Sequence, residues 1–226
     1  MLQYRTRVKV CGLTRVEDVR SAVLAGADAI GLVFYAKSAR LVSLEQAREL
    51  RRAVPAMVDV VALFVNADPS YVTQVIDVVQ PDVLQFHGDE SPEYCQQFGR
   101  RYMRAFRVGA PGLETPGQVL AACRAFDTAS AWLFDSYSAG YGGSGLAFDF
   151  SLLDQVRQAP DARAMVLAGG MNDQTVGNAI RAVTPYAVDV SSGVEASPGI
   201  KSAQKIAKFI AAVGHGDAAL KPATET

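Results

Sequence analysis

Cysteine is scarce in this sequence. Its 226 residues include only three cysteines, Cys11, Cys95 and Cys123, and no two of them form a CxxC pair. An odd number without paired spacing argues against a disulfide framework and against a zinc site, and it is typical of a reducing compartment. We therefore predict no disulfides and no bound metal.

Charge of one sign, long apolar runs and export signals are also lacking. The formal net charge is −1 at pH 7, which gives no electrostatic reason to expect binding to nucleic acid or to an anionic membrane. No apolar run approaches the length needed to span a bilayer, and the first residues, MLQYRTRVKV, lack the apolar centre of a signal peptide. We therefore expect a soluble cytoplasmic protein.

Apolar residues, in contrast, make up 50% of the chain, enough to fill a sizeable core. Many of them gather in eight short runs rich in Val, Ile, Leu and Phe, most of which lack clean alternation. Such runs are typical of parallel strands that are buried on both faces. The runs cover residues 7–11, 28–34, 58–65, 82–86, 102–108, 131–135, 164–170 and 187–193.

Segments with helical spacing of apolar residues lie between these runs, and capping signals mark where they begin. Two of them start with the spacing of a capping box, at Thr14 with Glu17 and at Ser43 with Gln46. Three others place a capping residue directly before a proline, at Asp68, Ser91 and Thr115. The pattern therefore predicts a helix after each strand.

Eight strand–helix units between residues 7 and 213 fit the compact end of the range for a (β/α)8 barrel, the TIM-barrel fold. An open doubly wound sheet is the alternative, but such sheets more often have five or six strands. We predict a single TIM-barrel domain over residues 1–213. The last stretch, GHGDAALKPATET, has no periodicity, so we expect a disordered C-terminal tail over residues 214–226.

Active sites of TIM barrels lie at the carboxyl ends of the strands, so the residues found there are the candidates for chemistry. Cys11 ends the first run, and Asp135 ends the sixth. An aspartate costs free energy to bury unless it is paired or protonated, so Asp135 is either a solvated turn residue or a functional group. Cys11 taken alone is more typical of a small buried apolar residue.

Three further strand-end residues could bind a ligand. His87 follows the fourth run without a second histidine or cysteine nearby, which favours an orienting role over metal binding. Arg40 follows the second run, and its guanidinium group is suited to holding a carboxylate with two hydrogen bonds. Asp189 lies in the eighth run.

Small residues end the seventh and eighth runs. The motifs AGG and SSG place Gly169, Gly170, Ser191, Ser192 and Gly193 at these two ends. Small residues let backbone N–H groups approach a phosphate, and TIM barrels often hold phosphate at this place. The pair of motifs predicts a phosphate site, although two ordinary glycine turns would look the same.

The stretch GYGGSG (140–145) matches the dinucleotide pattern G-x-G-x-x-G, but it lies five residues after a strand and in the sixth unit instead of the first. It also fails as a Walker loop, because Leu146 stands where lysine is required. We interpret it as a mobile lid over the mouth of the barrel.

Six motifs along the chain form a recognisable set. They are KVCGLT (9–14), KSAR (37–40), QFHGDE (85–90), LFDS with GYGGSGLAFDF, LAGG (167–170) and DVSSGVE (189–195). Taken together, they resemble the phosphoribosylanthranilate isomerase family of tryptophan biosynthesis, occur in that family's order and span nearly the whole chain. Two departures are Ala39, where the family often has proline, and Ser144 with Leu146, where it often has threonine and lysine.

The resemblance implies an Amadori rearrangement of N-(5-phosphoribosyl)anthranilate to 1-(2-carboxyphenylamino)-1-deoxyribulose 5-phosphate without metal or cofactor. It implies that Asp135 is the general acid that opens the ribose ring, and that Cys11, as a thiolate, removes the proton from C2. For a thiol to act in this way near neutrality, its pKa has to be lowered. A carboxyl group can act as the acid if its site keeps it protonated.

The remaining implied roles concern binding. Arg40 would pair with the anthranilate carboxylate, and the glycine and serine turns would hold the phosphate. Asp189 and His87 would contact sugar hydroxyls or orient other groups. A monomer and a homodimer are both compatible with the sequence.

Two alternatives stay open. One is another sugar-phosphate barrel enzyme, either indole-glycerol-phosphate synthase or the related isomerase of histidine biosynthesis. The synthase would need catalytic lysines and a glutamate at strand ends, which are not found here. The histidine-pathway isomerase would need paired aspartates on the first and fifth strands, but the first strand offers Cys11. The other alternative is a phosphate-binding barrel without catalytic activity.

Overall fold

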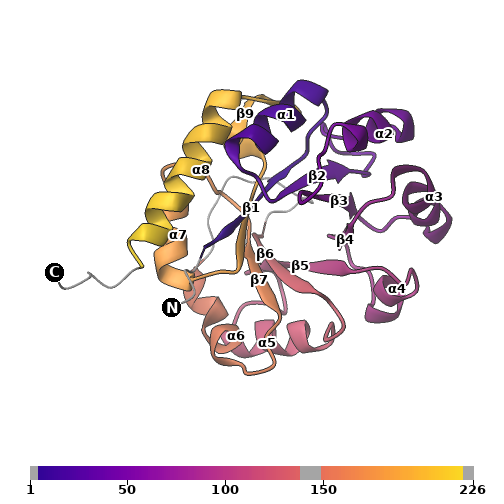
Figure 1. Cartoon of the computed structure of the whole chain (residues 1–226). Coiled ribbons are helices and arrows are strands. Elements are labelled where there is room, and N and C mark those ends of the chain that lie inside the picture. The colour runs from indigo at the N-terminus through magenta and orange to yellow at the C-terminus, as the bar shows by residue number, and fades with distance from the viewer. Residues whose placement is uncertain (1–4, 138–148, 221–226) are drawn as a thin grey trace.

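Eight parallel strands form a closed ring at the centre of the molecule in the computed structural model, which describes residues 5–137 and 149–220 (Figure 1). They follow one another around the ring in sequence order, and β8 pairs with β1 to close it. The predicted TIM barrel is therefore confirmed, and the open sheet is excluded. The strands are β1 Arg7–Cys11, β2 Ala29–Val33, β3 Asp59–Phe64, β4 Val83–Phe86, β5 Tyr102–Val108, β6 Ala131–Ser136, β7 Ala164–Leu167 and β8 Ala187–Val190.

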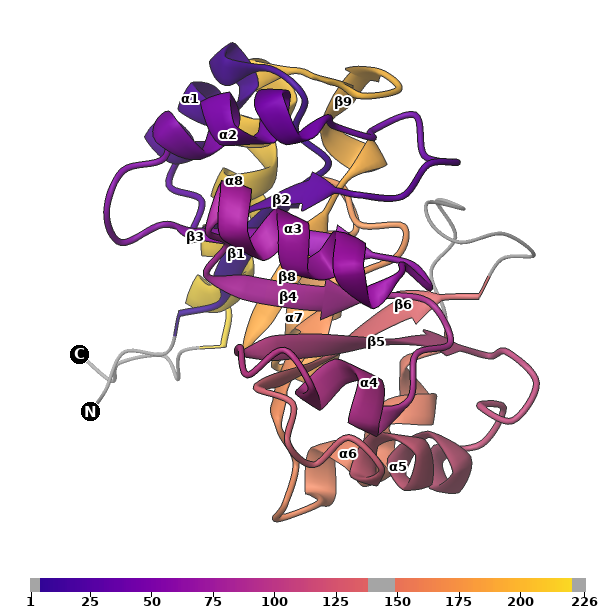
Figure 2. The same ribbon diagram turned by 90° about the vertical axis from the view of Figure 1, so that its right-hand side faces the viewer.

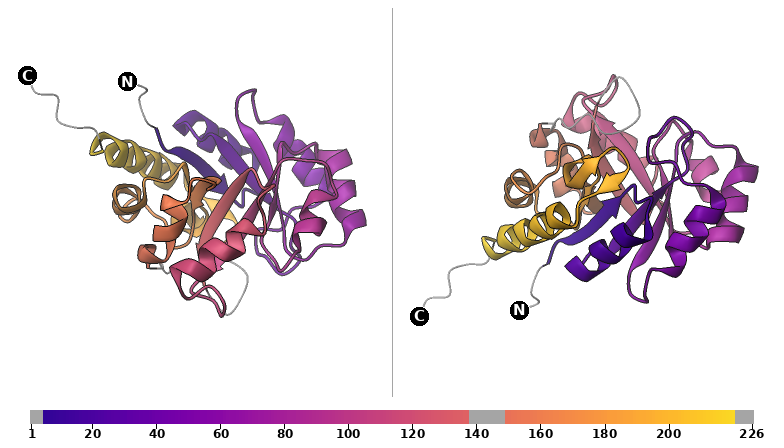
Figure 3. Two further views of the ribbon diagram at one scale, coloured as in Figure 1. Left: turned by 90° about the horizontal axis from the view of Figure 1, so that it is seen from below. Right: turned by 90° about the horizontal axis from the view of Figure 1, so that it is seen from above.

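Helices surround the ring and cover the outer face of the strands, as seen along the barrel in Figure 1 and from two sides in Figure 3. A small hairpin of β9 (Glu195–Ser197) and β10 (Ile200–Lys201) follows β8 and the short 3-10 helix η2 (Ser192–Val194). The helices are α1 Val16–Ala25, α2 Leu44–Arg52, α3 Pro69–Val79, α4 Pro92–Gln96, α5 Pro116–Arg124, η1 Phe150–Leu153, α6 Asp154–Gln158, α7 Val176–Val183 and α8 Ala203–Ala218. In the described part of the chain, no helix has the length and apolar composition needed to cross a membrane.

Most of the predicted caps are present. The side chains of Ser43, Asp68, Ser91 and Thr115 each accept a hydrogen bond from a backbone N–H in the first turn of their helices. The box predicted at Thr14 is wrong, because α1 begins one residue later, after Arg15, and has no side-chain cap. The Thr14 hydroxyl instead donates to the carbonyl oxygen of Gly199 at 2.6 Å, a partner that only the fold supplies.

The core has two layers, because successive strand residues point to opposite faces. The outer layer packs the strands against the helices and contains most of the large buried side chains. The inner layer closes the lower part of the barrel with smaller residues, among them Val61, Leu133 and Val166. Above these residues, polar and apolar side chains together line a pocket at the carboxyl ends of the strands.

The predicted tail needs correction. Helix α8 continues to Ala218 and therefore includes residues that were expected to be disordered. Two glycines in this segment weaken helical propensity, but the buried carboxylate of Asp217 accepts hydrogen bonds from the backbone N–H and the hydroxyl of Thr6. This contact holds the end of α8 against the chain entering β1. The predicted lid at 140–145 lies outside the described residues.

Candidate active site

The strand arrows point toward one side of the molecule (Figure 2), and a pocket opens there at the carboxyl ends of the strands. Residues from β1, β2, β3, β4, β6 and β8, and from the loops after them and after β7, line it. The predicted site residues that meet in this pocket are Cys11, Arg40, His87, Asp135, Gly169, Gly170, Asp189, Ser191 and Ser192. The barrel therefore brings together residues that are far apart in the sequence.

Cys11 reaches the pocket from β1, and a buried ion pair lies in the same region. Two residues before Cys11 and on the same face of the strand, Lys9 places its Nζ 2.9 Å from Oδ1 of Asp189. Burial raises the pKa of the Cys11 thiol, the ammonium of Lys9 acts against this, and Asp189 adds to the rise. The residues around Cys11 therefore do not by themselves lower the pKa of its thiol, because desolvation of the thiolate outweighs the nearby cations.

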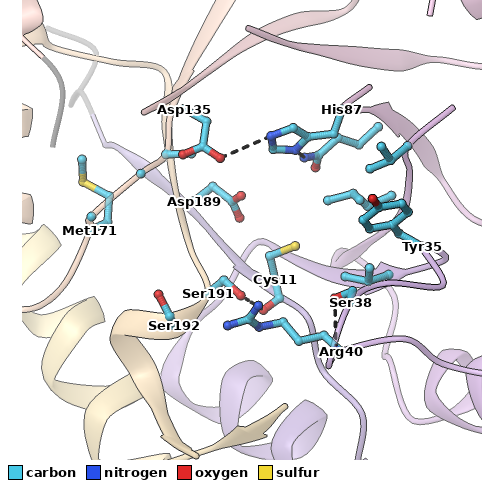
Figure 4. A pocket seen from close by; sticks show the side chains of 17 residues that line it. Cys11, Tyr35, Ser38, Arg40, His87, Asp135, Met171, Asp189, Ser191 and Ser192 are labelled. Carbon is cyan, nitrogen blue, oxygen red and sulfur yellow. Dashed lines mark hydrogen bonds and ion pairs between the residues drawn. The ribbon is translucent and has the colours of Figure 1, made fainter. Parts of the chain in front are cut away.

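Asp135 reaches the pocket from β6 and faces His87 (Figure 4). Oδ2 of Asp135 lies 3.2 Å from Nε2 of His87, and Oδ1 accepts a hydrogen bond from the backbone N–H of Ser136. On the other side of the ring, Nδ1 of His87 lies 3.2 Å from the side-chain amide nitrogen, Nε2, of Gln85. The His87 ring therefore lies between the side chains of Asp135 and Gln85. The orienting role predicted for His87 from the sequence would act on these two side chains.

Gly169 is required for the Asp135 geometry. Its φ is +74°, a conformation that favours glycine, and a Cβ there would lie 2.7 Å from Oδ1 of Asp135. The turn after β7 can therefore pass directly beside the carboxyl group. Gly193, in contrast, is not among the described residues that line the pocket. It packs against the carbonyl oxygen of Met171.

Arg40 lies in the pocket, and it already has a carboxylate partner. Its Nε and Nη2 donate to the two carboxylate oxygens of Glu195 at 2.7 and 2.8 Å. Hydrogen bonding to Glu195 raises the pKa of Arg40, so the guanidinium group keeps its charge. Sequence reasoning missed this partner, because Glu195 lies in a hairpin that is not part of the barrel repeat.

Several other residues of the pocket were not predicted from the sequence. Val33, Leu63 and Val65 form an apolar wall together with Cys11, and Tyr35 packs against it. Lys9 could have been found from the two-residue alternation that starts at Cys11. The wall residues could not be separated from ordinary core residues, since both are apolar and lie in strands.

No metal site is evident among the residues that the structure describes: three or more His, Cys, Asp or Glu side chains are nowhere grouped so that they could hold an ion. A closed (β/α)8 barrel with carboxyl, thiol, imidazole and guanidinium groups in a pocket at the carboxyl ends of its strands defines the class of TIM-barrel enzymes. The model of the N-(5'-phosphoribosyl)anthranilate isomerase family matches residues 8–212. The chain belongs to this family, whose members act as isomerases in tryptophan biosynthesis.

Individual relatives agree with this assignment. The chain is 61% identical over 209 residues to N-(5'-phosphoribosyl)anthranilate isomerase of Bordetella parapertussis, which covers 92% of this chain and 96% of that protein. The isomerase of Dechloromonas aromatica is 50% identical over 214 residues, with 94% of this chain and 98% of that protein covered.

Solved structures show the same fold. The isomerase from Thermotoga maritima superposes with a TM-score of 0.84 at 39% identity, covering 93% of this chain and 99% of that one. A further isomerase structure, in complex with reduced 1-(o-carboxyphenylamino)-1-deoxyribulose 5-phosphate, has a TM-score of 0.80 at 36% identity and the same coverage. Another concerns monomers made from the dimeric Thermotoga maritima enzyme.

Proposed function

We propose that Asp135 is the general acid and Cys11 the general base of this isomerase. Asp135 protonates the ribose ring oxygen of N-(5'-phosphoribosyl)anthranilate, so the bond from this oxygen to C1 breaks and a Schiff base forms. The Cys11 thiolate takes the proton from C2, which leaves an enolamine. C1 then takes a proton back from the Cys11 thiol, and the enol hydroxyl on C2 gives its proton to the Asp135 carboxylate. The ketone 1-(2-carboxyphenylamino)-1-deoxyribulose 5-phosphate forms, and both groups return to their starting states.

The observation that carries this proposal is that Cys11 and Asp135 reach one pocket from β1 and β6 (Figure 4). A sugar between them can lose a proton to one group and receive a proton from the other. The proposal requires a protonated carboxyl group beside a thiolate. This is the reverse of their ordinary order of acidity in water, so the occupied site must keep Asp135 protonated and stabilise the Cys11 thiolate.

The surroundings of Asp135 can accommodate the protonated form. An amide can turn by 180° without changing its shape, which would place Oε1 of Gln85 beside Nδ1 of His87. That oxygen has no hydrogen-bond partner among the described residues in its present orientation. With the ring proton on Nδ1, Nε2 of His87 becomes an acceptor for a proton carried by Asp135.

The rest of the pocket matches the two ends of the substrate. The apolar wall of Val33, Leu63 and Val65 is suited to the aromatic ring, and Arg40 beside it to the ring carboxylate. Gly169, Gly170, Ser191 and Ser192 supply backbone N–H groups for the phosphate, to which Gly193 contributes through its own N–H or by its packing. We expect His87 and Asp189, which line the same pocket, to contact sugar hydroxyls. The ligand in the relative's structure has the same three parts.

The fall of anthranilate fluorescence on substrate conversion tests these roles. We expect Cys11→Ser and Asp135→Asn each to lower kcat by roughly 10²-fold or more, the low end of general acid–base contributions, with little change in product binding. Cys123→Ser is a matched control, because this buried thiol lies outside the pocket. Near-normal turnover in either site variant would contradict the assigned role.

Three further expectations are tested separately, the first of them with the same assay. Catalysis without a metal or cofactor predicts that a chelator leaves the rate unchanged. A monomer or a homodimer is expected from the sequence, and sedimentation of the active protein decides between them. We also propose that the enzyme acts in the cytoplasm, which cell fractionation checks.

A further inference from the structure

The hairpin after β8 carries a charged cluster that the mechanism above does not use. Glu195 at its start is buried, and its Oε1 lies 2.8 Å from Nζ of Lys201, which is also buried. The backbone N–H of Gly199 donates to the same oxygen at 3.3 Å. Glu195 is therefore held from the hairpin side, and both of its oxygens also face Arg40.

A guanidinium group has two edges that can each hold a carboxylate. Glu195 occupies the edge formed by Nε and Nη2 of Arg40. The second edge, formed by Nη1 and Nη2, has no partner on Nη1 among the described residues, and Arg40 lines the pocket. The carboxylate of Glu195 thus fixes the plane of the Arg40 guanidinium group and leaves the second edge of this group for the carboxylate of a ligand.

The stem of Arg40 is fixed as well. It crosses the backbone directly after Cys11, where a Cβ on Gly12 would lie 2.3 Å from Cδ of Arg40. Gly12 has φ +76°, so this position suits glycine for its conformation and for the space it leaves. The stem and the charged end of Arg40 are therefore both held.

The charges of the cluster also suit an anionic ligand. Two cations, Arg40 and Lys201, share the single carboxylate of Glu195, so the cluster keeps one net positive charge. Lys201 in addition donates to the carbonyl oxygen of Ser191 at 3.1 Å, in the turn proposed to hold phosphate. The hairpin thus connects the two proposed anion-binding parts of the pocket.

We propose that Glu195 is a positioning residue for substrate recognition: it holds Arg40 so that the free edge of the guanidinium group receives the carboxylate on the aromatic ring. Lys201 supports it by balancing the charge of Glu195. This inference rests on the role of Arg40 in the proposed function. Without Glu195 the guanidinium group can rotate about its last torsions, and the geometry for two parallel hydrogen bonds is lost.

Two ligands separate this role from a merely structural ion pair. The first is reduced 1-(o-carboxyphenylamino)-1-deoxyribulose 5-phosphate, and the second is the same compound without the ring carboxylate. We expect Glu195→Ala to weaken binding of the first ligand by roughly tenfold and of the second by less than about twofold, measured by calorimetry. Glu195→Gln, which keeps the shape, should lose less. In kinetics, KM should rise with little change in kcat.

Two further variants test whether Glu195 acts through Arg40 and whether any buried glutamate–arginine pair would have the same effect. In an Arg40→Ala background, Glu195→Ala should change neither affinity further, because the group it positions is gone. Glu90→Gln is the matched control: Glu90 is also a buried partner of an arginine, Arg104 at 3.1 Å, and this change should leave the ratio of the two affinities unchanged.

Equal weakening of both ligands, or of neither, in Glu195→Ala would overturn the proposal and make the pair structural. If Glu195→Ala does not fold, Glu195→Gln and Lys201→Met are judged by the same ratio. If the unaltered protein binds both ligands equally, Arg40 does not recognise the carboxylate, and this inference falls together with that part of the proposed function. Discrimination in the unaltered protein that survives in Glu195→Ala overturns only the positioning role.

Discussion

Cys11 has charged neighbours on several elements, and they act on its thiol in opposite directions. Lys9 lies on its own strand, Asp189 on β8 and Lys201 on the hairpin, while Arg40 lies in the loop after β2. Burial raises the pKa of the thiol, and Lys9 is the cation that counters this most. Asp135 and His87 face the same pocket from β6 and from the end of β4. We infer that Lys9 determines how readily Cys11 becomes a thiolate.

Replacing Lys9 by methionine should therefore make Cys11 less reactive. Removal of the cation raises the pKa of the thiol further, so less thiolate is present at a given pH. We expect the rate of alkylation by iodoacetamide at pH 8 to fall by roughly threefold or more, and the rate–pH curve to move to higher pH. The measurement is mass spectrometry of the peptide that contains Cys11.

Lys208→Met is the control for this change, because Lys208 is an exposed lysine on α8. It should leave the rate–pH curve where it is. An unmoved curve in Lys9→Met would show that the ammonium group serves only to neutralise Asp189.

Helix α8 shows how a long-range contact extends an element. Ile206, Phe209 and Val213 are fully or almost fully buried, so most of the helix is anchored by its apolar face. Beyond Val213 the sequence offers glycines and little periodicity, and Asp217 takes over as the anchor through Thr6. The Asp217 carboxylate therefore helps to hold the last turn of α8, together with the packing of Gly216 against α7.

Asp217→Ala should lower the free energy of unfolding by about 2–4 kcal/mol. The change removes two hydrogen bonds to a charged acceptor and leaves a buried backbone N–H of Thr6 unpaired. Chemical denaturation followed by circular dichroism measures it. Because Thr6 precedes β1, at the end of the barrel away from the pocket, kcat and KM should not change.

Asp173→Ala is the comparison for the surface, since Asp173 is exposed, and it should change stability by less than about 0.5 kcal/mol. If the two variants are equally stable, the contact with Thr6 does not hold α8 in place.

At the scale of the whole molecule, the buried thiols make stability depend on pH. Burial raises the pKa of Cys95 to about 12, and it raises the pKa of Cys11 and of Cys123 as well. A raised pKa means that the folded protein keeps its thiol protons at a pH at which the unfolded chain has begun to lose them. The stabilisation is complete below the unfolded pKa and is lost as the pH rises through it toward the folded value.

We therefore expect the free energy of unfolding to fall between about pH 9 and pH 10, by up to about 1.4 kcal/mol per pH unit for each buried thiol. Replacing both Cys95 and Cys123 by alanine should make the decline shallower, even though it lowers stability at pH 7. Urea denaturation over this pH range checks the slope. An unchanged slope would show that other groups cause the decline.

Local pattern was sufficient for much of the fold. The first and fifth apolar runs, residues 7–11 and 102–108, coincide with β1 and β5, because short Val-, Ile- and Phe-rich runs between capped helices have few other stable arrangements. The caps at Asp68, Ser91 and Thr115 were predictable for a similar reason, since each interaction spans only a few residues. The order of the units then placed Cys11, Asp135 and Asp189 at one end of a barrel.

The sequence by itself therefore determined the elements, their order and the end of the barrel where the chemistry gathers. Only the tertiary structure decided the partners: Thr14 binds Gly199, Lys9 binds Asp189, Arg40 binds Glu195, and Asp217 extends α8 by binding Thr6. These contacts join residues that are more than 150 positions apart. Hydrophobic periodicity describes what each segment buries, whereas a buried charge takes whichever partner the closed barrel brings within hydrogen-bond distance.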